Sequence, residues 1–388
     1  MTFLNRSASR YFGALGFGLL ALVGAQQVQA SEVVFGHISS VTHPSSSFNA
    51  KDLRGGLQMA FDAANAGGGV NGNLLKLDAR DDNLDEKQMA AITAEFVANP
   101  NIVGLIGYLN SGGLAALAKE EAFGKAGIAQ VSPYQGNANI VQAANVYPFR
   151  VGYTDEVLAL LKEAQNTFKK NIALVNYNLA FGPPMVKFAQ DQAAVMKLPV
   201  SAVAELDSKP NADMAGSVQR AVAALVTAKP DAVMLIGAGK VALDFIAAVR
   251  KSELGRIKIY AMSPIVPAAL VSTVGEDAAH GVVLAQATPY PYSQTSKLAS
   301  EYHTALRQFA PNQLPSFAHF EGFIGGKIAI AALRRAGSKP TRASLLKALN
   351  GLGAYDLGGP VVNYSESARK GWGKTELVIV GPKGSIIR

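Results

Sequence analysis

A glycine-rich turn between a strand and a helix is the first place where residue types and spacing suggest chemistry. Residues 102–106 form a short apolar run, which is typical of a strand buried on both faces. The turn residues 107–113 follow, and apolar residues at helical spacing come next. Backbone N–H groups at the start of such a helix, beside the side chains of Asn110 and Ser111, would suit an anion or a carbonyl oxygen. The alternative is that the glycines only make a tight turn.

A second glycine-rich turn resembles a nucleotide-binding motif. Residues 237–242 read GAGKVA, which fits the G-x-G-x-x-A form of the dinucleotide fingerprint between a strand and a helix. That fingerprint also needs an acid near the end of the next strand, where it would bind the ribose. The next strand ends in Tyr260, Ala261 and Met262. We therefore expect no dinucleotide and no other cofactor.

The residue sets that hydrolases and metalloenzymes use are missing. The five histidines are scattered without the H-x-x-x-H spacing of a zinc site, and the chain has no cysteine for thiolate ligands or disulfides. There is no G-x-S-x-G elbow and no phosphate loop, and the S-x-x-K matches at residues 344–347 and 367–370 lack their companion motifs. These observations predict no metal site and a binding protein rather than an enzyme.

The first thirty residues have the pattern of a secretion signal. Arg6 and Arg10 form a basic start, residues 11–23 are apolar and uncharged, and residues 28–30 (VQA) match a small-x-small cleavage site. The apolar core is short for a membrane span, although an uncleaved anchor is the alternative. We expect cleavage after Ala30, so that residues 1–30 are a signal peptide and the mature chain is periplasmic.

Length and charge limit the remaining possibilities. A chain of 388 residues is too long for one ordinary core and predicts about two domains. The formal net charge is +8, but the basic residues are spread thinly, with isolated pairs such as Lys169-Lys170 and Arg334-Arg335. Without a basic stripe interleaved with aromatic residues, we expect no nucleic-acid partner.

The first half of the mature chain alternates strands with helices. Strands are predicted at residues 32–38, 74–79, 102–106 and 128–131. Between the first two, Leu57, Ala60, Phe61 and Ala64 mark one face of a helix that ends at the glycines 67–69. Asp85, followed by Gln88, predicts a capping box for the next helix. This order predicts a parallel sheet with helices on both faces.

The same pattern restarts after residue 150. Strands are predicted at residues 172–176, 200–205, 232–236 and 257–261, and helices at 157–164, 185–195, 214–228 and 241–251. Further on, we expect strands at 282–286, 358–363 and 376–380 and helices at 321–336 and 342–349. The fold class is therefore α/β, with two similar Rossmann-like halves.

Several segments together resemble the type I periplasmic binding proteins of ABC importers, and in particular the branched-chain amino-acid (leucine/isoleucine/valine) binding proteins. The likeness extends over nearly the whole mature chain, in the order expected for that family. The matching segments are residues 61–72 (FDAANAGGGVNG), Asp81-Asp82, 103–107 (VGLIG) with Ser111, 131–133 (VSP), 147–150 (YPFR), 230–233 (PDAV) and 336–338 (AGS).

The resemblance implies a Venus-flytrap fold of two lobes joined by three crossovers, with a ligand between the lobes. Residues 32–152 and 280–357 would form lobe one, and residues 153–279 and 358–388 would form lobe two. Crevice rules for open α/β sheets place a ligand at the same carboxyl ends of the strands.

The family pattern also implies a set of ligand-binding positions. In lobe one, Asn110 and Ser111 match a serine turn that holds a ligand carboxylate. The other first-lobe positions are Phe48, Asn49, Tyr108, Tyr134, Gln135 and Gly136. The positions in lobe two are Tyr177, Phe181, Ala238, Gly239 and Ser263.

The function implied is that of a solute-binding protein, expected to be a monomer, that closes on a small molecule and delivers it to an inner-membrane ABC permease. Two alternatives stay open, namely a sensor on the same fold and an exported enzyme.

In the amino-acid binders of this family, an acid from lobe two pairs with the ligand's ammonium group. The matching turns at residues 176–182 and 262–265 contain no acid, and we expect the nearest acids to be Asp244 and Glu253, on or at the end of a helix that faces away. This favours a ligand with a carboxylate or carbonyl group but no ammonium, and the rival is an ordinary amino acid.

Overall fold

The computed structural model describes residues 31–43, 46–178, 182–208 and 212–388. The predicted signal peptide, residues 1–30, lies outside these residues, as does Phe181. In the described part of the chain, no helix is long and apolar enough to cross a membrane.

The first sheet is parallel and has the strand order β2-β1-β3-β4-β5. Its strands are β1 (Ser31–Ile38), β2 (Asn73–Arg80), β3 (Ile102–Ile106), β4 (Gln130–Val131) and β5 (Val146–Tyr147). The helices along this part of the chain are α1 (Ser47–Ala66), α2 (Glu86–Ala98), α3 (Ser111–Lys119), α4 (Ala122–Lys125) and α5 (Ala138–Val141). The four predicted strands in this region are confirmed.

The second sheet repeats this topology in its parallel part. Its order is β15-β14-β10-β9-β8-β6-β7, so the strands β6 to β10 are arranged as β1 to β5 are, and β14 and β15 add an antiparallel edge. The strands are β6 (Ile172–Tyr177), β7 (Val200–Leu206), β8 (Ala232–Ile236), β9 (Lys258–Ala261), β10 (Val283–Gln286), β14 (Glu376–Val380) and β15 (Ile386–Ile387). The accompanying helices are α6 (Tyr153–Asn166), α7 (Gly182–Val195), α8 (Met214–Ala228), α9 (Gly239–Lys251), α10 (Pro267–Val274) and α11 (Glu276–Ala279).

The rest of the chain returns to the first sheet before it ends in the second. The helices α12 (Lys297–Phe309), α13 (Phe317–Ala336) and α14 (Arg342–Asn350) pack into the core of the first sheet. A three-stranded antiparallel sheet follows, formed by β11 (Gly353–Asp356), β12 (Val361–Tyr364) and β13 (Arg369–Lys370), and a 3-10 turn, η1 (Pro382–Gly384), precedes β15. The described chain thus passes between the two sheets three times, after β5, after β10 and after β13. We call the first sheet with its covering elements the first lobe, and the second sheet with its helices the second lobe.

Two segments depart from the lobe boundaries expected from the sequence. Strand β10 was expected in lobe one, but it pairs with β9 and β14 in the second sheet. Strand β12 was expected in lobe two, but Val362 and Tyr364 are buried in the core of the first lobe, and the Tyr364 hydroxyl donates to the Pro148 carbonyl oxygen over 2.7 Å. An apolar run predicts a strand but does not tell which sheet the strand joins.

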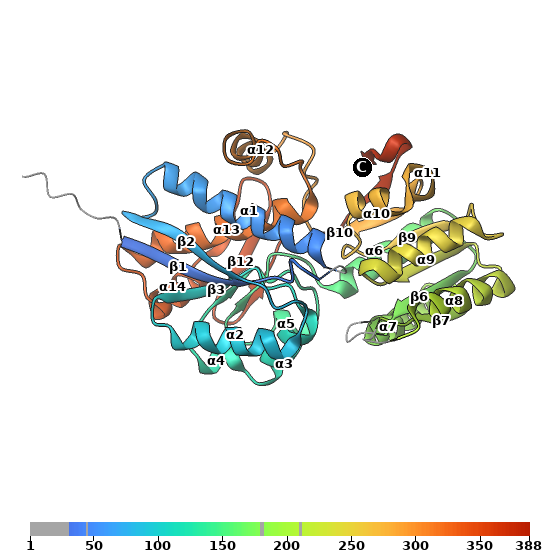
Figure 1. Cartoon of the computed structure of the whole chain (residues 1–388), viewed down its shortest axis with the longest axis horizontal. Helices are drawn as coiled ribbons and strands as arrows, with labels where there is room; N and C mark the ends of the chain where they lie inside the picture. The colour runs from blue at the N-terminus through green and yellow to red at the C-terminus, as the bar shows by residue number, and fades with distance from the viewer. Residues whose placement is uncertain (1–30, 44–45, 179–181, 209–211) are drawn as a thin grey trace, which may run out of the picture. The chain divides into compact units, whose positions relative to one another are not determined.

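Helices α1 and α13 lie side by side in the first lobe (Figure 1). Glycines allow this close approach, because a Cβ atom at Gly56 would lie 1.9 Å from the His319 carbonyl oxygen and one at Gly322 would lie 2.1 Å from the Leu53 carbonyl oxygen. Helix α13 is buried on almost every side, as expected for a small-residue helix in a core. The opposite face of the first sheet packs on α2 and α3 through a separate cluster that includes Met89, Phe96 and Leu114.

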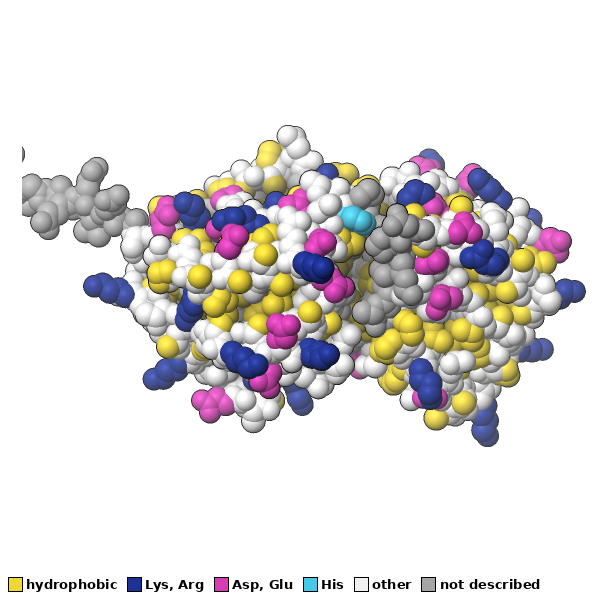
Figure 2. All heavy atoms as spheres, turned by 60° about the horizontal axis from the view of Figure 1, so that its bottom comes forward, with side chains coloured by type: hydrophobic (Ala, Val, Ile, Leu, Met, Phe, Trp, Pro, Cys, Tyr) yellow, Lys and Arg dark blue, Asp and Glu magenta, His cyan; other side chains and the backbone are white. Residues whose placement is uncertain are grey.

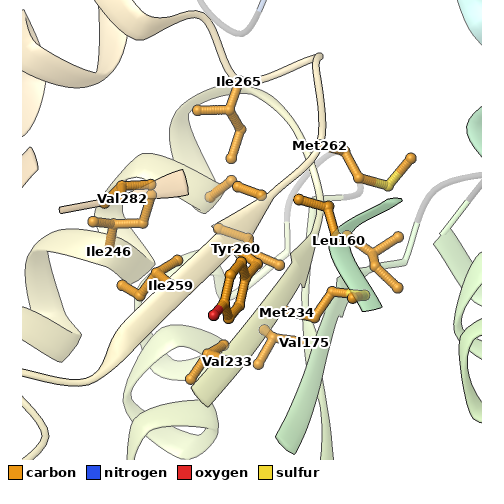
Figure 3. Packing of buried hydrophobic residues seen from close by; sticks show 14 of the residues in the cluster. Leu160, Val175, Val233, Met234, Ile246, Ile259, Tyr260, Met262, Ile265 and Val282 are labelled. Atoms are coloured by element: carbon orange, nitrogen blue, oxygen red, sulfur yellow. The ribbon is translucent and has the colours of Figure 1, made fainter. Parts of the chain in front are cut away.

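One continuous cluster fills the second lobe. Figure 3 shows side chains of this cluster on neighbouring strands, where Tyr260 of β9 is paired with Met234 of β8 and Ile259 is paired with Val233. Met262 and Ile265 belong to the same cluster and anchor both ends of the loop that follows β9. Because both flanking side chains are buried, Ser263 and Pro264 between them are held in place relative to the sheet.

Candidate functional site

The loops at the carboxyl ends of the two sheets contact each other directly. Asn49, on α1 of the first lobe, donates from Nδ2 to the Pro264 carbonyl oxygen over 3.3 Å. The Tyr134 hydroxyl donates to Asn49 Oδ1 over 3.4 Å. Tyr134 follows β4 and Pro264 follows β9. The predicted residues Asn49 and Tyr134 of the first lobe thus meet the residue next to the predicted Ser263 of the second lobe.

Asn110 has a different role from the one expected. Its Oδ1 accepts hydrogen bonds from the backbone N–H groups of Gly112 and Gly113, so it is the N-cap of α3. Its Nδ2 donates to Asp82 Oδ2 over 2.8 Å, and Ser40 donates to the other Asp82 oxygen over 2.6 Å. The expectation of unpaired N–H groups at this helix start is therefore wrong for Gly112 and Gly113, because Asn110 itself satisfies them. The glycine-rich turn is held by a buried network instead.

Ser111 lies next to the second predicted turn of the first lobe. Its Oγ accepts a hydrogen bond from Gln135 Nε2 over 2.6 Å, and Gln135 Oε1 accepts from the backbone N–H groups of Gly136 and Asn137. Gly136 packs so closely that an added Cβ would lie 2.8 Å from the Tyr153 ring. The loops after β3 and β4 are thus joined through Ser111, Gln135 and Gly136.

Tyr108 does not line the site that we expected it to line. Its side chain is fully buried in the cluster under α2, together with Phe96 and Leu114. The Thr93 hydroxyl lies within hydrogen-bond distance of its hydroxyl, at 3.5 Å. Burial raises the pKa of Tyr108 above its ordinary value. Gly107, the residue before Tyr108, has a φ of 66°. The spacing of residues in the sequence did not show that the Tyr108 side chain points toward the core.

Arg150 is a central residue of the site that the sequence analysis did not select. Its guanidinium stacks on the Tyr134 ring, with Cζ 4.1 Å from the ring centroid. Nε lies 3.1 Å from Glu321 Oε1 in an ion pair without hydrogen-bond geometry, and Nη2 donates to Glu321 Oε2 over 3.3 Å. Nη2 also reaches Ser263 Oγ at 3.3 Å. In the sequence, residues 147–150 (YPFR) indicated only the family likeness.

Ser263 links this cluster to a second buried acid. It donates from its backbone N to Glu156 Oε2 over 2.9 Å and from Oγ to Glu156 Oε1 over 2.8 Å. Glu156 lies in the first turn of α6 and is fully buried. Burial raises the pKa of Glu156, and Arg150 and Ser263 oppose that shift. The expectation that Asp244 and Glu253 are the nearest acids to this loop is therefore wrong.

Burial and opposite charge act together on the Arg150–Glu321 pair. Burial raises the pKa of Glu321, and Arg150 and Thr288 oppose the shift. For Arg150, burial lowers the pKa, but Glu321, Tyr134, Tyr153 and Glu156 together raise it by more, so the pKa is raised and the guanidinium stays charged. Both side chains are only 1% exposed. One cation thus lies between two buried acids in this part of the structure.

The remaining predicted residues have less specific surroundings. Phe48 is 51% exposed on the first turn of α1. Tyr177 is buried at the end of β6. Ala238 is the N-cap of α9 without a side-chain bond, and Gly239 has a φ of 65°. These positions lie at strand ends or helix starts, as expected.

The described residues contain no group of three or more acids, histidines or cysteines that could hold a metal ion. His37 donates from Nδ1 to the Ile106 carbonyl oxygen, and its Nε2 lies within hydrogen-bond distance of the Ser39 hydroxyl. His319 contacts the Tyr302 hydroxyl, so both histidines have partners in the core. On the face shown in Figure 2, acidic and basic side chains are interspersed without a continuous basic stripe.

Comparison with known proteins decides the family. Residues 32–378 match the family described as periplasmic binding protein. The chain belongs to this family. The resemblance predicted from the sequence is confirmed. Membership implies a periplasmic location and a solute-binding role.

Solved structures agree on the fold. A substrate-binding periplasmic protein from Ralstonia solanacearum is similar with a TM-score of 0.84 and 26% identity, covering 92% of this chain and 99% of that one. A possible leucine/isoleucine/valine-binding protein from Rhodopirellula baltica SH 1 has a TM-score of 0.81 at 22% identity, covering 92% and 96%. A fatty acid ABC transporter substrate-binding protein from Thermomonospora curvata has a TM-score of 0.78 at 19% identity, covering 92% and 91%. The last two share the fold alone.

A curated relative named amino acid binding protein, from Pseudomonas aeruginosa strain PAO1, is 27% identical over 144 residues. The match covers 37% of this chain and 38% of that protein's length.

Proposed function

We propose that this periplasmic binding protein captures a small solute between its lobes and delivers it to an inner-membrane ABC permease. The observation that carries the proposal is the Asn49–Pro264 hydrogen bond, because it joins the first turn of α1 in the first lobe to the loop after β9 in the second. A solute that contacts both lobes would favour the closed arrangement by its differential affinity for it. In this proposal Asn49, Ser111, Tyr134, Gln135 and Ser263 contact the solute.

The solute class that we propose is a small carboxylate-bearing, amino-acid-like molecule. From the sequence we expected a ligand without an ammonium group, because no acid lay beside the loop after β9. Glu156 now supplies a carboxylate there, within 2.9 Å of the Ser263 backbone nitrogen. A buried carboxylate is a suitable partner for a cation that has lost its water. The name of the Pseudomonas relative agrees with an amino acid.

Two measurements test the solute class. Mass spectrometry of molecules released from the purified protein on unfolding would identify what it carries. Calorimetric titration would then compare leucine with its deaminated 2-oxo analogue. Tighter binding of leucine would support recognition of an ammonium group, and tighter binding of the 2-oxo acid would restore the ammonium-free alternative.

Closure and delivery need their own experiments. Small-angle scattering with the identified solute should give a smaller radius of gyration than the solute-free protein gives, and an unchanged radius would argue against closure. Uptake of that solute should fall in cells lacking the gene. Normal uptake would favour the sensing alternative, and turnover of the solute would favour the exported enzyme.

Two further measurements test the processing and the oligomeric state of the chain. N-terminal sequencing of periplasmic protein should find Ser31 as the first residue if residues 1–30 are a cleaved signal. Light scattering should give the mass of a monomer.

A further inference from the structure

One buried carboxylate holds two of the three crossovers. Arg150 lies in the first crossover, after β5, and Thr288 lies in the second, after β10. Both contact Glu321 of α13: the Arg150 Nη2 atom is 3.3 Å and the Thr288 hydroxyl 3.0 Å from Glu321 Oε2. The first and second crossovers must bend when the lobes move. Both are therefore bonded to the same helix of the first lobe, α13.

The same guanidinium reaches the second lobe. Arg150 Nη2 donates to Ser263 Oγ over 3.3 Å, and Ser263 is held by Glu156 of α6. The next residue, Pro264, accepts the hydrogen bond from Asn49 of the first lobe. In the loop after β9, the residue that contacts the first lobe, Pro264, thus directly follows the residue that Arg150 holds, Ser263.

Burial makes this arrangement stiff. The side chains of Arg150 and Glu321 are each 1% exposed, so separating them would leave a charge without a partner in a poorly solvated place. The planar guanidinium can contact Glu321 and Ser263 at once, whereas a lysine ammonium cannot reproduce that fork. Stacking on Tyr134 fixes the plane of the guanidinium further.

We propose that Arg150 is a positioning residue that couples the crossovers to the loop after β9 and thereby favours the arrangement in which the two lobes touch. The proposal rests on closure of the lobes, as the proposed function does, but not on any particular solute. Arg150 acts through Ser263 and Glu321, and it needs no contact with the solute itself.

The test measures the separation of the lobes without a solute. The chain has no cysteine, so single cysteines introduced by Lys87→Cys on α2 and Ala223→Cys on α8, both exposed, can carry spin labels. Protein freed of bound molecules by unfolding and refolding is then compared with its Arg150→Lys variant by pulsed distance measurement. We expect the ratio of open to closed protein to rise about tenfold, as for the loss of one hydrogen bond to a charged group. The exposed Arg307→Lys variant on α12 is the matched control and should leave the ratio unchanged.

A second variant separates positioning from stability. Arg150→Met combined with Glu321→Gln removes both charges of the ion pair, so that neither of these two is left buried alone, while Glu156 keeps its hydrogen bonds from Ser263. We expect its melting temperature to lie closer to that of wild type than the melting temperature of Arg150→Met alone does, while the distances stay shifted toward the open state. A wild-type distance distribution in Arg150→Lys, or in the double variant, would overturn the proposal.

The design also distinguishes this inference from the proposed function. Adding the solute identified by mass spectrometry to labelled wild-type protein should shorten the distances. If it does not, the transport proposal fails, whereas the effect of Arg150→Lys in solute-free protein still decides the role of Arg150.

Discussion

Asn49 donates a hydrogen bond from its side-chain amide to the Pro264 carbonyl oxygen over 3.3 Å, although the two residues are 215 positions apart. The same amide accepts a hydrogen bond from the Tyr134 hydroxyl. One side chain near the start of α1 therefore bridges a loop of its own lobe and a loop of the other lobe. This relationship makes Asn49 the most direct probe of closure.

Asn49→Ala should weaken solute binding by about 0.5–1.5 kcal/mol, because it removes a hydrogen bond available only when the lobes touch. Calorimetric titration with the solute released from the wild-type protein would measure the change. Gln58→Ala, an exposed position on the same helix, is the control and should bind as wild type does. Equal affinities for Asn49→Ala and wild type would show that the bridge contributes nothing to closure.

Asn110→Asp tests the network under the glycine-rich turn. The substitution keeps an oxygen that can cap α3, but it replaces the amide donor with a second carboxylate beside Asp82, whose Oδ2 lies 2.8 Å from Asn110 Nδ2. We expect the free energy of unfolding at neutral pH to fall by about 1–3 kcal/mol, the cost of a buried acceptor left without its donor. Urea denaturation would measure it.

Asn137→Asp is the matched control, because Asn137 also caps a helix through Oδ1 and accepts from the Asn139 backbone N–H over 3.0 Å. It should change stability little. If both variants lose the same amount, proximity to Asp82 is not the cause.

Two tyrosine substitutions separate the core from the site. Tyr108→Phe should leave solute affinity unchanged, because the Tyr108 side chain is buried under α2. Tyr134→Phe should weaken binding by about 0.5–1.5 kcal/mol, because its hydroxyl donates to Asn49. The same titration measures both variants, each serving as the control for the other. A larger loss of affinity for Tyr108→Phe would contradict the placement of these side chains.

His37 should make the stability of the protein depend on pH. Burial lowers the pKa of His37 to about 3, with the Ile106 carbonyl opposing and Arg54 adding to the shift. The pKa of a histidine in the unfolded chain is about 6.5. Between about pH 3 and about pH 6.5, therefore, His37 binds a proton in the unfolded chain but not in the native protein. The stability that neutral His37 supplies is therefore complete above about pH 6.5 and is lost as the pH falls toward about 3.

The test compares wild type with His37→Asn by urea denaturation between about pH 7.5 and about pH 4.5. The difference in unfolding free energy between them should shrink by up to about 1.4 kcal/mol per pH unit below pH 6.5. Gln58→Ala, an exposed position without a titratable side chain, is the control and should show no such trend. A constant difference for His37→Asn would mean that His37 gains a proton in the native state.

Local sequence patterns determined most of the individual elements. The apolar run at residues 102–106 is β3, and Asp85 accepts a hydrogen bond from the Gln88 backbone N–H at the start of α2, as a capping residue should. These features depend on neighbours a few positions apart, so hydrophobic periodicity and capping chemistry are enough to predict them. Helix α12 was not predicted, although Ser296 caps it in the same way.

The family likeness supplied the two-lobed fold and the loops of the site, but not the direction of each side chain. Asn110 was expected to stand beside free N–H groups, and it caps them instead. The predicted helix began at Val157, whereas α6 begins at Tyr153, and this earlier start puts Glu156 in its first turn, against Ser263. A shift of a few residues in a helix start changes which side chains face a neighbouring loop.

The sequence by itself therefore determined the α/β halves, their strand order along the chain and the family. Only the tertiary structure decided that Arg150 and Glu321, 171 positions apart, form one buried pair that also reaches Ser263. The physical reason is that a buried charge needs a partner within a few ångströms, and packing of the lobes, rather than distance along the chain, determines which residue is that near.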